Sequence, residues 1–156
     1  MKPFISVVLH EPEIPQNAGN IARLCACTNV RLILVGKLGF SMSNKYMKRS
    51  GLDYWDKVEI LKFVSYQDFL EHVEKTGGNI YYFTTHGTKP HFDFNFKDGD
   101  YFVFGSESKG LPDWIMNLDK DSHIRLPMYG ELRSLNLSNT VAVAVYEAIR
   151  QIQPEF

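Results

Sequence analysis

The sequence has few cysteines and no long hydrophobic run. Cys25 and Cys27 are the only cysteines among its 156 residues. Their C-x-C spacing is neither the C-x-x-C of redox sites nor half of a zinc site, so we expect two small buried hydrophobes. A run of about 18 apolar residues, which a membrane-spanning helix needs, is absent. The N-terminus lacks the features of a signal peptide, so we expect a cytoplasmic protein without membrane segments.

Metal-ligand spacing is also missing. The histidines are far apart in the sequence and give no zinc-type pattern, and we therefore expect no metal site; they are His10, His72, His86, His91 and His123.

The chain has no excess of either charge. Seventeen Lys and Arg face 18 Asp and Glu, for a formal net charge of −1, so the composition does not indicate a uniformly basic nucleic-acid-binding domain. The distribution is uneven, however, because residues 14–52 contain no acid. The charged side chains of that stretch are all basic, and they can form a positive surface: Arg23, Arg31, Lys37, Lys45, Lys48 and Arg49.

Familiar phosphate-binding and nucleophile motifs are absent as well. No G-x-G-x-x-G occurs, so a dinucleotide site of the Rossmann type is unsupported. The loop 105–112 is not a Walker A motif, because Leu111 stands where lysine is required. Glu107 occupies the serine position of G-x-S-x-G. What is present is a strand-to-helix loop with two glycines, which allow a ligand to approach the backbone closely.

The remaining pattern predicts one α/β domain over residues 1–156. With 44% hydrophobic and 22% charged residues, the chain has an ordinary globular composition. Strand-like runs are expected at 4–9, 31–35, 58–61, 79–85, 101–104 and 123–126. Helices are expected at 15–29, 45–50, 66–75, 112–118 and 136–151. This alternation predicts a mainly parallel sheet with helices on both faces.

Two further segments are richer in polar residues than their structure requires. Asn17, Gly19 and Asn20 are poor helix formers in the first turns of the helix that Pro15 opens. Residues 133–139 place several Ser and Asn before an apolar helix, although capping needs only one. The excess polar groups indicate a site.

Taken together, these segments resemble the SPOUT superfamily of S-adenosylmethionine-dependent methyltransferases. The closest similarity is to its small tRNA (cytidine/uridine) 2′-O-methyltransferases of the TrmL (YibK) type, and it covers essentially the full chain. Three motifs match in order: Pro15–Arg23, Phe104–Pro112, and Ile124–Met128 with Arg133–Asn139. The resemblance implies a C-terminal trefoil knot, which is a rare topology. It also implies a homodimer with the active site at the subunit interface.

The resemblance further implies a set of site residues. S-adenosylmethionine is expected among Phe83, Thr84, Thr85, His86, Gly105, Glu107, Gly110, Ile124, Leu126, Met128, Ser134 and Asn136. Arg23 matches the arginine that acts on the ribose 2′-hydroxyl; because arginine stays protonated, we favour positioning and charge stabilisation. The other expected catalytic residues are Asn17, Glu107, Ser138 and Asn139. RNA contacts are expected at Arg23 and, from the acid-free stretch, at Lys45, Lys48 and Arg49. Tyr146 is expected to contact RNA or to support the dimer.

The implied reaction is methylation of the wobble nucleotide, in the anticodon stem-loop of leucine tRNAs. The first alternative is a related enzyme acting on another tRNA position or on ribosomal RNA, since the motifs serve the methyl donor and the ribose. A non-catalytic RNA-binding module and a flavodoxin-like small-molecule binder are further alternatives.

Overall fold

The computed structural model describes residues 2–43, 45–46 and 54–155. Its described strands form one seven-stranded sheet in the order β3-β2-β1-β6-β4-β7-β5, and each named pairing is parallel. The strands are β1 (Ser6–His10), β2 (Arg31–Val35), β3 (Ile60–Phe63), β4 (Ile80–Phe83), β5 (Lys89–Pro90), β6 (Tyr101–Phe104) and β7 (His123–Arg125). The predicted parallel α/β fold is confirmed.

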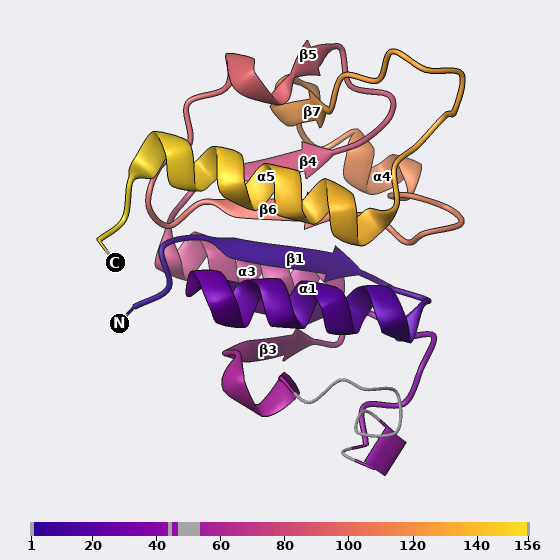
Figure 1. Ribbon diagram of the computed structural model, residues 1–156, viewed down its shortest axis with the longest axis vertical. Helices are drawn as coiled ribbons and strands as arrows, with labels where there is room; N and C mark the ends of the chain where they lie inside the picture. The colour runs from indigo at the N-terminus through magenta and orange to yellow at the C-terminus, as the bar shows by residue number, and fades with distance from the viewer. Residues whose placement is uncertain (1, 44, 47–53, 156) are drawn as a thin grey trace.

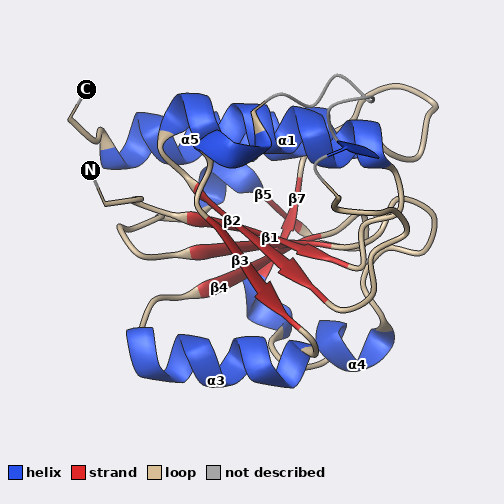
Figure 2. Cartoon of the chain, turned by 90° about the horizontal axis from the view of Figure 1, so that it is seen from below, coloured by secondary structure: helices blue, strands red, loops and turns tan. Residues whose placement is uncertain are grey.

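Helices cover both faces of this sheet. Figure 2 shows α1 and α5 together on one side, and α3 and α4 on the other. The helices are α1 (Pro15–Thr28), α3 (Tyr66–Thr76), α4 (Asp113–Met116) and α5 (Leu137–Ile152), with 3₁₀ turns η1 (Trp55–Lys57), η2 (His91–Asp93) and η3 (Lys120–Ser122). No helix among the described residues is long and apolar enough to cross a membrane.

The core consists of two clusters, one on each face of the sheet. Strand β1 is buried along its whole length, and its side chains alternate between the faces. Val7 and Leu9 pack in the cluster that includes residues of α1 and α5. Val8 packs in the other cluster, with Phe69 and Val73 of α3. Burial on both faces explains why the central strands are continuous apolar runs.

Local signals explain where two helices begin. Pro15 occupies the first turn of α1, where its missing N–H costs no hydrogen bond. Ser65 caps α3 by accepting a hydrogen bond from the Asp68 backbone N–H, and the Asp68 side chain accepts one from the Ser65 N–H. This is the predicted capping box.

Several expectations need correction. The first strand begins at Ser6 rather than Phe4 and includes His10. The edge strand β5 and the three 3₁₀ turns were not expected from the sequence. Cys25 is buried as expected, but Cys27 is exposed, because the two side chains point to different faces of α1. Of the helix expected at 45–50, the described part is helical at Lys45 and Tyr46, and the rest lies outside the described residues.

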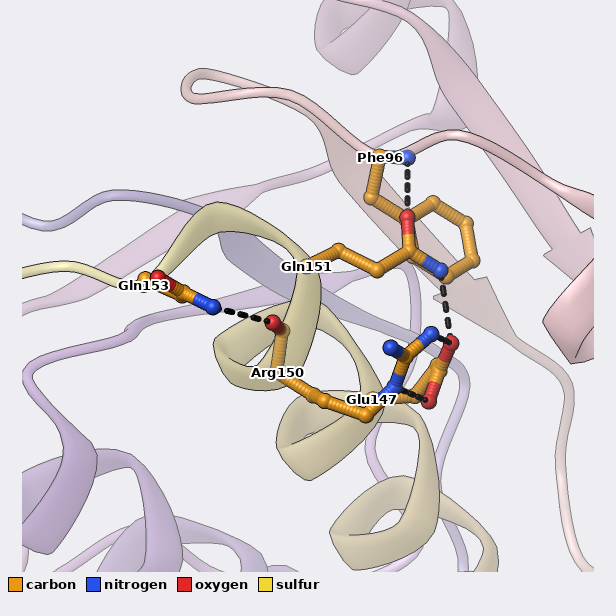
Figure 3. A network of polar contacts seen from close by, with 5 residues as sticks. All are labelled: Phe96, Glu147, Arg150, Gln151 and Gln153. Carbon is orange, nitrogen blue, oxygen red and sulfur yellow. Dashed lines mark hydrogen bonds and ion pairs between the residues drawn. The ribbon is translucent and has the colours of Figure 1, made fainter.

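A polar network ties the end of α5 to the chain between β5 and β6 (Figure 3). The Phe96 backbone N–H donates to the Gln151 Oε1 at 2.8 Å, and the Gln151 amide donates to Glu147 at 2.6 Å. Arg150 binds both oxygens of Glu147, at 2.8 and 2.9 Å. The network holds the chain that follows β5 against α5.

Candidate functional site

A cavity of about 1030 Å³ opens at the carboxyl ends of β4, β6 and β7. Parallel strands end at the same edge of the sheet, the right-hand side of Figure 1, and ligands of open α/β sheets bind there. The loops 84–88, 105–111 and 133–137 contribute most of its lining. All the residues expected to hold the methyl donor line this cavity: Phe83, Thr84, Thr85, His86, Gly105, Glu107, Gly110, Ile124, Leu126, Met128, Ser134 and Asn136.

The loop after β6 closes on itself at the cavity wall. The Gly110 N–H donates to the Ser106 carbonyl at 2.9 Å, and these two residues form an isolated antiparallel bridge. Gly110 has φ +65°, which side chains disfavour. A Cβ at Gly105 would collide with the backbone of Gly110 and Leu111. Gly105 therefore serves the closure of the loop, and it also lines the cavity.

The Glu107 carboxylate holds the N-terminus of α1. It accepts hydrogen bonds from the backbone N–H groups of Glu13 at 2.8 Å and Ile14 at 3.0 Å. Helix α1 has no side-chain cap of its own and no acid in its first turn. A carboxylate at this end is favoured both by the free N–H groups and by the helix dipole. Glu107 thus acts as a cap from a distant part of the chain.

The same carboxylate begins a chain of amide contacts, which we call the Glu107 network. The buried Asn17 side chain donates to Glu107 Oε1 at 3.3 Å and accepts from the Asn136 amide at 3.1 Å. The Asn136 oxygen accepts from both the backbone N–H and the hydroxyl of Ser138. The network joins the three sequence motifs in one place, and it gives Asn17, Asn136 and Ser138 a role beyond capping.

Other predicted residues lie away from the cavity. Arg23 is exposed on α1 and does not line it. Asn139 is exposed in the first turn of α5, and Tyr146 is 57% exposed further along that helix. Lys45 is exposed. Lys48 and Arg49 lie outside the described residues.

Four basic residues at the cavity were missed by the sequence analysis. Arg125, Arg133, Lys109 and Lys120 line the cavity, and all four are exposed. Lys109, Arg125 and Arg133 belong to the three motifs, and Lys120 lies between two of them, all outside the acid-free stretch 14–52 in which basic surface was expected. Exposed Asp113 also lines the cavity, but the four cations give it a predominantly positive rim.

The histidines do not gather into a metal site. No group of three or more His, Cys, Asp or Glu side chains that could hold a metal ion occurs among the described residues. His10, at the end of β1, is buried with its ring edge-on to Tyr66 at 5.9 Å. Burial lowers the pKa of His10, and nearby Glu11 opposes that shift. The side chain is part of the packing.

Fold and cavity define an α/β protein with a cavity beyond the carboxyl ends of its strands. The chain belongs to the SpoU rRNA Methylase family, whose model matches residues 5–146. This confirms the methyltransferase family indicated by the three motifs.

Similar proteins cover nearly the whole chain. A tRNA (cytidine(34)-2′-O)-methyltransferase of Polaromonas sp. is 48% identical over 95% of this chain and 91% of its own length. The Escherichia coli (strain K12) protein of the same name is 44% identical, over 96% and 94%.

Two solved structures extend the comparison. One, described under "Structural insights into the 2-OH methylation of C/U34 on tRNA", has a TM-score of 0.87 and 42% identity over 94% of this chain and 95% of its own. The SpoU methyltransferase AviRb from Streptomyces viridochromogenes, in complex with AdoMet, has a TM-score of 0.83 and 26% identity over 97% of this chain and 61% of its own.

Proposed function

We propose that the protein transfers a methyl group from S-adenosylmethionine to the ribose 2′-oxygen of the wobble nucleotide of tRNA, a cytidine or uridine. The observation that carries this proposal is the cavity, because residues of all three family motifs line it together. The names of the relatives, which specify cytidine 34 of tRNA, support the choice of substrate. The AdoMet complex of AviRb supports the choice of donor.

The cavity fits the methyl donor in size and chemistry. Its volume of about 1030 Å³ lies at the upper end of the usual range for small-molecule pockets. Leu126 and Met128 offer apolar packing for the adenine ring, and backbone groups at the strand ends offer hydrogen bonds. When bound, the donor supplies an electrophilic methyl group on a sulfonium. The ribose 2′-oxygen would accept this methyl group, with S-adenosylhomocysteine as the leaving group and the hydroxyl proton passing to solvent or to a neighbouring phosphate.

Arg23 is proposed to orient the 2′-hydroxyl and to stabilise the charge that develops on its oxygen. A hydroxyl is a weak nucleophile, so its position relative to the methyl group is decisive. Arg23 is exposed and lies outside the lining of the cavity in its own chain. We therefore propose a homodimer in which Arg23 of one copy serves the cavity of the other. Val143 and Tyr146, exposed by 42% and 57% on α5, offer apolar surface for that second copy.

The RNA is proposed to be the anticodon stem-loop of leucine tRNAs, in the cytoplasm. The positive rim of Lys109, Lys120, Arg125 and Arg133 favours a polyanionic substrate. A related 2′-O-methylation elsewhere in tRNA or in ribosomal RNA remains the second candidate, because the cavity serves the donor and the ribose.

One experiment tests reaction and substrate together. The protein is incubated with methyl-labelled S-adenosylmethionine and tRNA from a strain lacking this enzyme, and the labelled nucleoside is mapped. Label on the 2′-oxygen of the wobble cytidine or uridine is expected. Label on the ribose of another nucleotide would contradict the proposed substrate, and label on a base would contradict the proposed reaction.

Arg23→Ala tests the proposed role of the arginine. Turnover should be lost while donor binding, measured by calorimetry, stays close to that of the wild type, because Arg23 is proposed to act on the ribose and not on the donor. An equal loss of donor affinity would contradict the role.

A further inference from the structure

The guanidinium group of Arg23 has an aromatic neighbour from another part of the chain. Its Cζ atom lies over the ring of Tyr54, 4.7 Å from the ring centroid. The ion pairs recorded among the described residues join Arg31 to Glu59 and Arg150 to Glu147, and neither involves Arg23. Among the described residues, the contact with Tyr54 is therefore the interaction that restrains the Arg23 side chain.

The turn that follows Tyr54 is anchored to the core of the protein. Tyr54 is half-buried and directly precedes the turn η1, where its carbonyl accepts a hydrogen bond from the Lys57 N–H at 3.0 Å. Trp55, the first residue of that turn, and Val58, which follows it, pack against the core cluster to which α1 contributes Ile21 and Ala22. The core thus holds the turn that directly follows Tyr54.

A ring face restrains an arginine differently from a carboxylate. A carboxylate pairs with the N–H donors and neutralises the charge. The ring attracts the cation through its face and leaves the in-plane N–H groups free. Among the described residues, no carboxylate forms an ion pair with Arg23. Arg23 is restrained, charged and still able to donate to a hydroxyl or a phosphate.

We propose that Tyr54 is a positioning residue for Arg23, holding the guanidinium in the orientation in which it meets the ribose and phosphate of the RNA. This inference rests on the proposed function, because it requires that Arg23 act on the RNA. It assigns Tyr54 to the methyl transfer step and not to binding of the donor, whose cavity Tyr54 does not line.

The test compares Tyr54→Leu with Tyr54→Phe, which keeps the ring. Steady-state kinetics with tRNA should show kcat lowered by about two- to fivefold in Tyr54→Leu, the rate effect of losing one exposed cation–π contact. KM for S-adenosylmethionine and Tm should stay unchanged in both variants. Tyr54→Phe should retain the wild-type kcat.

Each other outcome overturns the proposal in a recognisable way. Equal losses in Tyr54→Phe and Tyr54→Leu would assign the effect to the hydroxyl. A wild-type or raised kcat in Tyr54→Leu would exclude a productive restraint, and a parallel loss of donor affinity or Tm would indicate a structural role only. The variant Arg23→Ala distinguishes a failure of the proposed role of Arg23 from a failure of the proposed role of Tyr54. If Arg23→Ala stays active, the role of Arg23 fails; if Arg23→Ala is inactive but Tyr54→Leu is normal, only the role of Tyr54 fails.

Discussion

The side chain of Glu107 connects parts of the chain that are far apart in the sequence. Its two oxygens accept from Glu13, Ile14 and Asn17, so the substitution Glu107→Gln places an NH₂ donor against an N–H donor and removes the charge at the start of α1. Leaving one such group unsatisfied costs about 1–3 kcal/mol. We expect Glu107→Gln to lower the free energy of unfolding by an amount in that range, measured by denaturant titration.

The matched control for this prediction is Glu131→Gln. Glu131 is exposed in the loop before α5, so the same chemical change should shift the free energy of unfolding by less than about 0.5 kcal/mol. Equal effects of the two substitutions would mean that the contacts of Glu107 contribute nothing to stability.

Glu147 gives a prediction about acid stability. The Arg150 side chain donates to this carboxylate and lowers its pKa from 4.5 to about 2, with help from Gln151 and against the effect of burial. A carboxylate whose pKa is lower in the folded state than in the unfolded state stabilises the protein at pH values above its ordinary pKa. That contribution is lost as the pH falls toward the pKa of the folded state. The difference in unfolding free energy between wild type and Glu147→Gln should therefore shrink between pH 4.5 and about 2. A difference that stays constant with pH would contradict it.

At the scale of elements, the loop between β6 and α4 should tolerate no side chain at its first position. A Cβ at Gly105 collides with the backbone of Gly110 and Leu111, which has no way to yield without opening the loop. We expect Gly105→Ala to weaken binding of S-adenosylmethionine at least about tenfold, measured by calorimetry, a loss of about 1.4 kcal/mol. Gly130→Ala is the control, because a Cβ there meets no atom within 4 Å. Similar affinities of the two variants for S-adenosylmethionine would mean that the loop does not contribute to donor binding.

Elements with a strong local signal could be predicted, and those set by their surroundings could not. The box of Ser65 and Asp68 identifies the start of α3, because both partners lie within one turn. Strand β5, by contrast, contains two residues, and Pro90 argues against a strand. Proline is acceptable there because β5 is an edge strand, where one side of the backbone needs no partner.

The cavity residues expected to hold the donor could be named from the sequence, but the geometry of the site could not be predicted. The motifs identified the residues of the cavity through resemblance. The hydrogen bond from Asn136 to Asn17 spans 119 positions, however, and no local pattern encodes such a pairing. The same holds for the contact between Arg23 and Tyr54. The trefoil knot implied by the resemblance stays a prediction, as does the homodimer.

For the whole molecule, the formal net charge of −1 conceals a positive rim at the cavity. If the rim contacts RNA phosphates, binding releases counterions and the affinity for tRNA falls steeply with salt. We expect the slope of log Kd against log salt to become shallower by about two when Lys120 and Arg125 are both replaced by Gln.

The control for this charge removal is Lys62→Gln, which takes one positive charge from β3. That strand is at the edge of the sheet opposite β7 and β5, and Lys62 is exposed there and outside the cavity. The slope of log Kd against log salt for Lys62→Gln should match that of the wild type. Fluorescence titration of labelled tRNA at several salt concentrations measures all three proteins. A slope change that is the same per charge removed in both variants would mean that tRNA responds to net charge alone. An unchanged slope in the double variant would place the phosphate contacts elsewhere, with the stretch 14–52 as the next surface to test.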